Sequence, residues 1–429
     1  MAAGISAGEA ANTARGHLPL AFGAFILIGL NDGAVGVLLP SVIAHYHITT
    51  ATVGLLFPAS ALGYLVAAFN IGALLERLGR RALLATGTGV WTAGALLFAT
   101  LPPFAALLPA VFAAGFGMAI IDAGLNAWVA ELPRGASRLN YLHAFYGVGA
   151  LLGPLLASAL LASVLGWNAT YYALALGGVA ALLGFLLRFE RGGAGRPTGV
   201  GRAADGRMDG GAGGGLLRAA LRAPLLWLCA AFLLLYVGVE VSLGAWSYSL
   251  LTLGRGVPHL AAGWMVSGYW LGLTLGRFAL ARLVERVGPR RIVPWLLAGA
   301  LAGLAALAWA GGGAALAAAG LWLVGFCLGP LFPSVIALIG AETEARLRQS
   351  AIGFAASMGS AGAALFPWVA ANLAQRLGLA ALPPYVAALT VALLALWLWL
   401  RPPPPGPLPP RGERGEQERG ARGGEQRGG

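Results

Sequence analysis

The chain has 429 residues, of which 58% are hydrophobic and only 10% are charged. Soluble globular domains carry roughly 25% charged residues, so this composition excludes an ordinary soluble protein and indicates an integral membrane protein. The formal net charge is +12, and every one of the 28 basic residues is arginine. Such an excess could indicate nucleic-acid binding, but the placement of the arginines described below favours a membrane explanation, and no nucleic-acid partner is expected.

Along the chain, residues 1–17 are predicted to form a cytoplasmic N-terminal tail without a signal-peptide pattern. Six apolar segments follow, each long enough to cross a hydrocarbon core that needs about 20 residues. A stretch rich in Gly and Arg, 189–222, is predicted to be a flexible cytoplasmic linker, and six further segments lead to a disordered cytoplasmic tail, 401–429. The expected spans are 18–44, 53–75, 82–101, 104–130, 139–165, 169–188, 223–252, 260–283, 291–311, 314–340, 350–373 and 382–400.

The chain contains an internal repeat. Glu76-Arg77-Leu78-Gly79 recurs as Glu285-Arg286-Val287-Gly288, and Gly115-Phe116 recurs at nearly the same spacing as Gly325-Phe326. Repeats of this length are typical of transporters built from two related halves. We therefore predict an all-α integral membrane protein with 12 transmembrane helices in two pseudo-symmetric six-helix bundles, 18–188 and 223–400.

The arginines predict the orientation. If the segments alternate between the two sides, Arg255 and Arg376 lie on one side of the membrane and all other arginines on the opposite side. By the positive-inside rule, the arginine-rich side is cytoplasmic, so both termini are expected in the cytoplasm. The expected location is the cell inner (plasma) membrane, as a multi-pass protein whose surroundings are the lipid bilayer.

Three acidic residues, Asp32, Asp122 and Glu240, lie inside apolar segments. An ionisable residue at mid-depth costs about 2.5–3.5 kcal/mol on insertion scales, so its default interpretation is functional. A carboxyl group removed from water favours its protonated form, which is what proton coupling requires. Because Arg277 falls near the cytoplasmic end of its segment, no cation is expected to pair with the three acids, and we predict that they are proton-coupling groups. The alternative is an acid held structurally by a polar neighbour such as Asn31.

Several polar and aromatic residues could contact a solute. Asn126 follows Asp122 by one helical turn, and His143 and Tyr146 share a helix face. His143 could be a proton relay, a hydrogen-bonding partner of the solute or a packed polar residue, and the aromatic residues could equally serve the membrane interface. The predicted substrate-binding residues are Asn31, Asn126, His143, Tyr146, Trp246 and Tyr269. Cys229 and Cys327 lie in apolar runs, and neither a metal site nor a cofactor is expected.

The segment from Gly72 to Leu84, GALLERLGRRALL, resembles the cytoplasmic signature of the major facilitator superfamily, with Glu76 where the pattern usually has Asp. The resemblance implies that superfamily's fold, a working monomer and a gating motif. Charge-assisted bonds of this motif would hold the two halves together in the outward-open state, whereas the alternative is a basic loop that only sets topology. The motif comprises Gly72, Glu76, Arg77, Gly79, Arg80 and Arg81, with Glu285 and Arg286 in the second half.

A narrower resemblance is to the fucose permease-like group of fucose:H+ symporters. It rests on Asp122, Asn126 and the run Arg138-Leu139-Asn140. The resemblance implies that Asp122 takes the place of the group's membrane Glu, and that His143 and Tyr146 stand where the permease has amides. On the first span, the permease's acid aligns with Gly36, whereas this chain has Asp32 one turn earlier.

These features together predict a secondary transporter that works by alternating access, with H+ symport of a small polar solute such as a monosaccharide. Na+ is an open alternative as coupling ion. A rival function is proton-coupled efflux of amphipathic compounds, because Gly149 to Pro154 resembles part of an antiporter signature, although it is also a GxxxG packing face. A membrane receptor or enzyme would need larger extramembrane domains or catalytic clusters, so no enzymatic activity is expected.

Overall fold

The computed structural model of the chain describes residues 7–189, 218–344 and 346–400. Most of the predicted linker 189–222, the whole predicted tail 401–429 and the first six residues lie outside these ranges. Within them, every regular element is a helix, which confirms the predicted all-α class.

The first half of the structure follows the predicted spans closely. The first helix, α1, begins inside the predicted N-terminal tail. Residue Gly79 interrupts the long helix α3 with φ 72° and ψ 162°, which separates it into the two spans expected from the sequence. Glycine reaches a positive φ without steric strain, so the signature glycine explains this kink. The helices are α1 (Ala7–Tyr46), α2 (Thr50–Val53), α3 (Leu56–Ala99), α4 (Phe104–Glu131), α5 (Gly135–Leu161) and α6 (Ala169–Arg188).

The second half repeats this plan. Gly288, with φ 84°, stands between α11 and α12 as Gly79 stands within α3. The predicted span 314–340 is divided at Gly329-Pro330 into α13 and α14, and a proline there removes a backbone N–H donor. The helices are α9 (Pro224–Arg255), α10 (His259–Ala279), α11 (Ala281–Val287), α12 (Pro289–Ala308), α13 (Gly313–Leu328), α14 (Leu331–Glu342), α15 (Arg348–Leu377) and α16 (Leu382–Trp399), with short 3₁₀ turns at Ala310–Gly312 and Leu379–Ala381.

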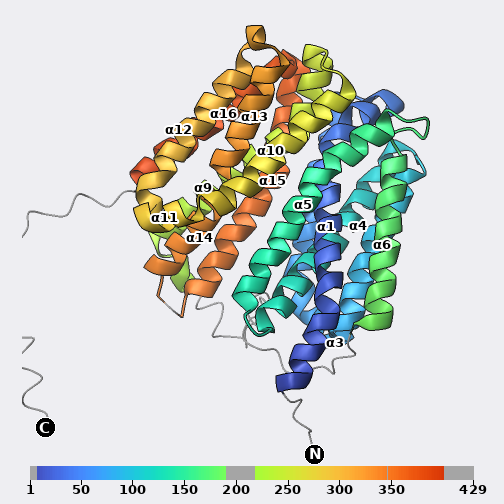
Figure 1. The fold of residues 1–429 in the computed structure, drawn as a ribbon, viewed down its shortest axis with the longest axis vertical. Helices are drawn as coiled ribbons and strands as arrows, with labels where there is room; N and C mark the ends of the chain where they lie inside the picture. Colours follow the sequence, from blue (N-terminus) through green and yellow to red (C-terminus); the bar gives the residue numbers. More distant parts are fainter. Residues whose placement is uncertain (1–6, 190–217, 345, 401–429) are drawn as a thin grey trace, which may run out of the picture.

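Ten helical runs among the described residues are long and apolar enough to cross a membrane. One of them, Thr50–Ala99, has 50 residues and contains the kink at Gly79, so it accounts for two crossings. The 21-residue helix α10, which carries Arg277, packs between α5 and α13 in the same way as its neighbours (Figure 1). Counted this way, the described helices agree with the twelve predicted spans.

The two groups of helices, α1–α6 and α9–α16, are called here the first half and the second half. We call the end of the molecule where α1 begins the terminal side, and the opposite end the far side. In Figure 1 the ribbons of the two halves lie close together toward the far side and diverge toward the terminal side, at the bottom. Contacts between the halves agree with this view: Gly36 of α1 lies against Gly244 of α9, and the Thr50 N–H donates to Gln375 Oε1 at 2.9 Å.

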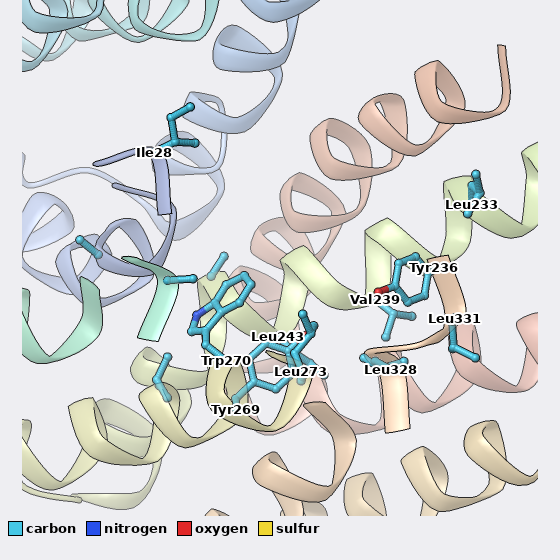
Figure 2. Packing of buried hydrophobic residues seen from close by; sticks show 14 of the residues in the cluster. Ile28, Leu233, Tyr236, Val239, Leu243, Tyr269, Trp270, Leu273, Leu328 and Leu331 are labelled. Carbon is cyan, nitrogen blue, oxygen red and sulfur yellow. The ribbon is translucent and has the colours of Figure 1, made fainter. Parts of the chain in front are cut away.

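One cluster of buried apolar side chains extends across both halves. Figure 2 shows members of it from α1 (Ile28), α9 (Leu243) and α10 (Tyr269 and Trp270). Because lipid is as apolar as these side chains, close packing and not the hydrophobic effect is what favours such contacts within a membrane. The two halves therefore meet through packed surfaces that surround the site described next.

Candidate functional site

A cavity of about 320 Å³ lies between the two halves. Its wall comes from α1, α3, α4, α5 and α6 of the first half and from α9, α10 and α15 of the second. The volume is at the lower end of the range for small-molecule sites, about 300–1,000 Å³. Residues of the wall with polar groups include Asn31, Asp32, Tyr64, Tyr146, Glu240 and Trp270.

Asp32 of α1 is held in the wall by two neutral donors. The Asn31 Nδ2 donates to Asp32 Oδ1 at 3.2 Å, and the Tyr146 hydroxyl donates to Asp32 Oδ2 at 3.0 Å. Tyr146 belongs to α5, which approaches α1 closely because glycines face each other: a Cβ on Gly29 would lie 2.1 Å from the Tyr146 carbonyl oxygen. Small residues at a helix interface permit this approach, so the glycine pattern positions the Tyr146–Asp32 bond.

Asp122 of α4 is held in a similar way. The Tyr64 hydroxyl of α3 donates to Asp122 Oδ2 at 2.8 Å, and Asn126 Nδ2 donates to Asp122 Oδ1, also at 2.8 Å. Asp122 and Asn126 are not in the cavity wall themselves, but Tyr64 is, so its hydroxyl connects Asp122 to the cavity. Asp32 lies within electrostatic range of both Asp122 and Glu240, so the structure gathers the three predicted acids around one site.

His143 lies outside the cavity wall, on the part of α5 nearer the terminal side. Its side chain is exposed, and its ring meets Phe25 of α1 edge-on with centroids 5.6 Å apart. It also interacts electrostatically with Asp122. His143 is therefore an exposed side chain within electrostatic range of Asp122, a position compatible with the relay among the three alternatives.

Glu240 differs from the other two acids because it has a cationic partner. Arg277 of α10 places Nη2 3.8 Å from Glu240 Oε1, and its Nε donates to the Gly329 carbonyl oxygen at 3.3 Å. The prediction that no cation would reach the membrane acids is wrong for Glu240. The backbone of Arg277 is close to the end of α10, as expected, but a long arginine side chain reaches well away from its own Cα.

Two further predicted substrate-binding residues, Trp246 and Tyr269, also lie outside the cavity wall, as Asn126 and His143 do. The Trp246 indole donates to the Pro367 carbonyl oxygen at 2.9 Å, and the Tyr269 hydroxyl donates to the Glu240 carbonyl oxygen at 2.9 Å. Both side chains are buried and fasten helices of the second half to each other. Tyr64 was not predicted from the sequence. Its polar hydroxyl group well inside an apolar segment could have indicated a buried hydrogen bond.

Trp270 of α10 also lines the cavity. Its side chain is 5% exposed, and its ring packs against Gly244, where a Cβ would lie 2.7 Å from Trp270 Cζ2. The indole Nε1 has no hydrogen-bond partner among the described residues. A buried donor without an acceptor is unfavourable, so this indole is an energetic cost that the described residues do not offset.

The predicted gating motif lies on the terminal side, apart from the cavity. Glu76 and Arg77 are exposed, as are Glu285 and Arg286 of the repeat. Arg80 forms an ion pair with Glu131 at 2.7 Å, and both residues belong to the first half. In this structure the motif thus fastens α3 to α4, and its predicted role in holding the two halves together stays a prediction. The remaining members, Gly72 and Arg81, lie on the same helix α3.

Comparisons with known proteins agree with this architecture. Residues 21–260 and 228–423 match the sequence profile of the Major Facilitator Superfamily. Bypass of stop codon protein 6 of Saccharomyces cerevisiae is 26% identical over 405 residues, which cover 88% of this chain and 80% of that relative.

Two solved structures share the fold. The nucleoside transporter NupG has a TM-score of 0.74 at 13% identity and covers 90% of this chain and 99% of its own. The fucose:proton symporter FucP of E. coli has a TM-score of 0.61 at 18% identity and covers 90% of this chain and 98% of its own. At such identities the likeness shows the fold alone. On the strength of the profile match, the chain belongs to the Major Facilitator Superfamily, a family of multi-pass membrane transporters and not of enzymes.

Proposed function

We propose that this chain is a proton-coupled symporter that moves a small uncharged polar solute, such as a monosaccharide, by alternating access between its two halves. The observation that carries the proposal is the cavity between the halves, whose wall contains a carboxylate, Asp32, held by neutral donors. A second such carboxylate, Asp122, is one hydrogen bond away from the wall through Tyr64.

Neutral donors suit acids that gain and lose protons. The described hydrogen bonds to Asp32 and Asp122 come from tyrosine hydroxyl and asparagine amide groups. A hydroxyl can donate to a carboxylate and accept from a carboxylic acid, and an amide offers both an N–H and a C=O. These partners can therefore satisfy either protonation state, and no charged group loses its counter-ion when a proton binds.

The rest of the wall supports an uncharged ring with hydroxyl groups. Aromatic side chains of both halves, including Phe57, Trp91 and Trp270, offer apolar faces for stacking. Asp32 supplies an acceptor in the wall and, when ionised, would repel an anion. A fucose:proton symporter and a nucleoside transporter share the fold, and both names refer to solutes with hydroxylated rings.

The remaining features of the proposal follow from the arginine distribution and the family. We propose that the terminal side faces the cytoplasm, that the protein resides in the plasma membrane and that the monomer is the working unit. Domain boundaries near 18–188 and 223–400 would then separate the two rocking bundles. No cofactor is proposed beyond the coupling ion, and H+ is favoured over Na+ because the acids have neutral donors as partners.

The test is solute uptake into proteoliposomes under an imposed pH gradient. Wild type, Asp122→Asn and the control Glu344→Gln, an exposed acid outside the cavity, would be compared with a panel of sugars, nucleosides and lipophilic cations. We expect sugar uptake driven by inward H+, loss of this uptake in Asp122→Asn with counterflow retained, and no change in the control. A sodium gradient in place of the pH gradient distinguishes the two coupling ions. Export of lipophilic cations against proton flow, without any sugar signal, would refute symport and support the antiporter.

A further inference from the structure

The three membrane acids have partners of different kinds. Asp32 and Asp122 accept hydrogen bonds from neutral groups, whereas Glu240 lies 3.8 Å from the guanidinium of Arg277. The Glu240 side chain is 13% exposed and that of Arg277 is 30% exposed, so the carboxylate is largely removed from solvent and the guanidinium partly so. Removing one partner of such an ion pair is destabilising, because the other charge is then left in a poorly solvated place without compensation.

Further contacts hold this pair in place. The Tyr269 hydroxyl donates to the Glu240 carbonyl oxygen, which fixes α10 to α9 at the level of the acid. Arg277 Nε donates to the Gly329 carbonyl oxygen, which ties the same side chain to the C-terminal end of α13. Tyr236, one turn before Glu240 on α9, is fully buried and interacts electrostatically with both Glu240 and Arg277. The guanidinium thus has a fixed direction as well as a counter-ion.

The Glu240–Arg277 pair also lies close to the Tyr146–Asp32 hydrogen bond in the cavity wall. Thr274, one turn before Arg277 on α10, contacts Gly147 of α5, where a Cβ would lie 2.7 Å from Thr274 Oγ1. Gly147 adjoins Tyr146, which donates to Asp32. The ionisable groups that face Glu240 and Arg277 are Asp32, Tyr146 and His143 from the first half and Tyr236 and Tyr269 from the second.

We propose that Glu240 stays ionised throughout the transport cycle as the counter-ion of Arg277, and that only Asp32 and Asp122 carry the coupled proton. Protonation of Glu240 would leave the Arg277 charge without its counter-ion, whereas the hydrogen-bond donors to the two aspartates are neutral and lose no counter-ion. Glu240 and Arg277 are then positioning residues, which hold a fixed charge pair beside the Tyr146–Asp32 bond. The inference rests on the proposed proton symport.

Charge-neutral variants test the pairing. Glu240→Gln and Arg277→Gln would be compared alone and combined, with Arg277→Lys as the conservative control. We expect each single neutral variant to lose more than about tenfold of proton-driven uptake, because each leaves one charge unpaired. The combined variant is expected to recover to within about threefold of wild type with an unchanged ratio of protons to solute, and Arg277→Lys is expected to keep coupling. A combined variant that retains counterflow but moves no protons would overturn the proposal.

A second measurement does not require those variants to fold. Infrared difference spectra of the Asp32→Asn/Asp122→Asn double variant would be recorded as the pH is changed above about 5.5, where ordinary exposed carboxyl groups are already ionised. We expect no carboxylic-acid band to titrate in this variant, although wild type shows one. A titrating band that disappears only on adding Glu240→Gln would overturn the proposal. Absence of proton-driven uptake in wild type would instead refute the proposed symport, while this spectrum would still report on Glu240.

Discussion

The far side and the terminal side of the molecule are fastened in different ways. On the far side the described contacts join one half to the other, through facing glycines and the Thr50–Gln375 hydrogen bond. On the terminal side the ion pairs Arg80–Glu131 and Arg290–Glu342 each join two helices of the same half. The halves can therefore separate at the terminal side without breaking these ion pairs, whereas opening the far side must break contacts between the halves.

The far-side contact is a matter of shape. A Cβ on Gly36 would lie 2.4 Å from the Gly244 carbonyl oxygen, and a Cβ on Gly54 would lie 2.6 Å from the Ala371 Cβ. Such backbone-to-backbone approach makes many dispersion contacts but few strong bonds. The contact can thus form and release within a transport cycle, and any added side-chain atom would obstruct it.

The terminal-side ion pairs follow the internal repeat. Arg80 comes directly after Gly79, and Arg290 comes two residues after Gly288; both glycines have positive φ and stand at equivalent kinks of the two halves. Their partners, Glu131 and Glu342, are the last residues of α4 and α14. Each ion pair therefore connects the helical segment that follows the kink to the end of a neighbouring helix. Because both partners belong to the same half, the pair stabilises that half and does not hinder its movement as a rigid body.

The largest expected effect comes from locking the far side. With Thr50→Cys and Gln375→Cys combined, oxidation should join α2 to α15 and stop solute uptake, because the far side can no longer open. Reduction should restore uptake, which would be followed in proteoliposomes. The single variants serve as controls, and the native Cys229 and Cys327 are buried. Full uptake with the cross-link in place would contradict the assignment of this contact to a closed gate.

A smaller but still large effect is expected from one methyl group. Gly36→Ala should reduce uptake by about tenfold or more, because its Cβ would meet the Gly244 carbonyl oxygen and prevent far-side closure. The matched control is Gly23→Ala on the same helix, where no atom lies within 4 Å of the added Cβ and where alanine favours the helix. Labelling of a cysteine at position 50 should rise in Gly36→Ala only. Equal uptake by the two variants would show that the close approach is not needed.

The sequence predicted the spans well because they have local causes. A run of apolar residues of membrane length can hardly be anything other than a span. A glycine between two spans, at Gly79 and again at Gly288, marks a backbone turn that other residues adopt with strain. The contact of Asn31 with Asp32 was stated as the structural alternative and is present, whereas Asn126, predicted to bind the solute, donates to Asp122.

The partners from other helices could not be foreseen in this way. Tyr64 is 58 residues from Asp122, and Tyr146 is 114 residues from Asp32, so only the packing of the helices brings them together. Arg277 shows a different reason: its depth was judged from its backbone, but the reach of its side chain decides what it pairs with. Trp246 was predicted to bind the solute because it is aromatic, but its indole N–H donates to the Pro367 carbonyl oxygen.

The smallest expected effect concerns the terminal-side ion pairs. Arg80→Gln and Arg290→Gln should each lower the free energy of unfolding by about 0.2–1 kcal/mol, because these pairs are about one-third exposed. The control Arg346→Gln removes a pair whose side chains are 72% and 63% exposed, and it should have no measurable effect. Thermal unfolding in detergent would measure all three. Because each pair braces one half from within, we expect the two variants to be additive when combined. A combined loss well above the sum would show that the two halves are coupled on the terminal side, and the contrast between the two sides would then be wrong.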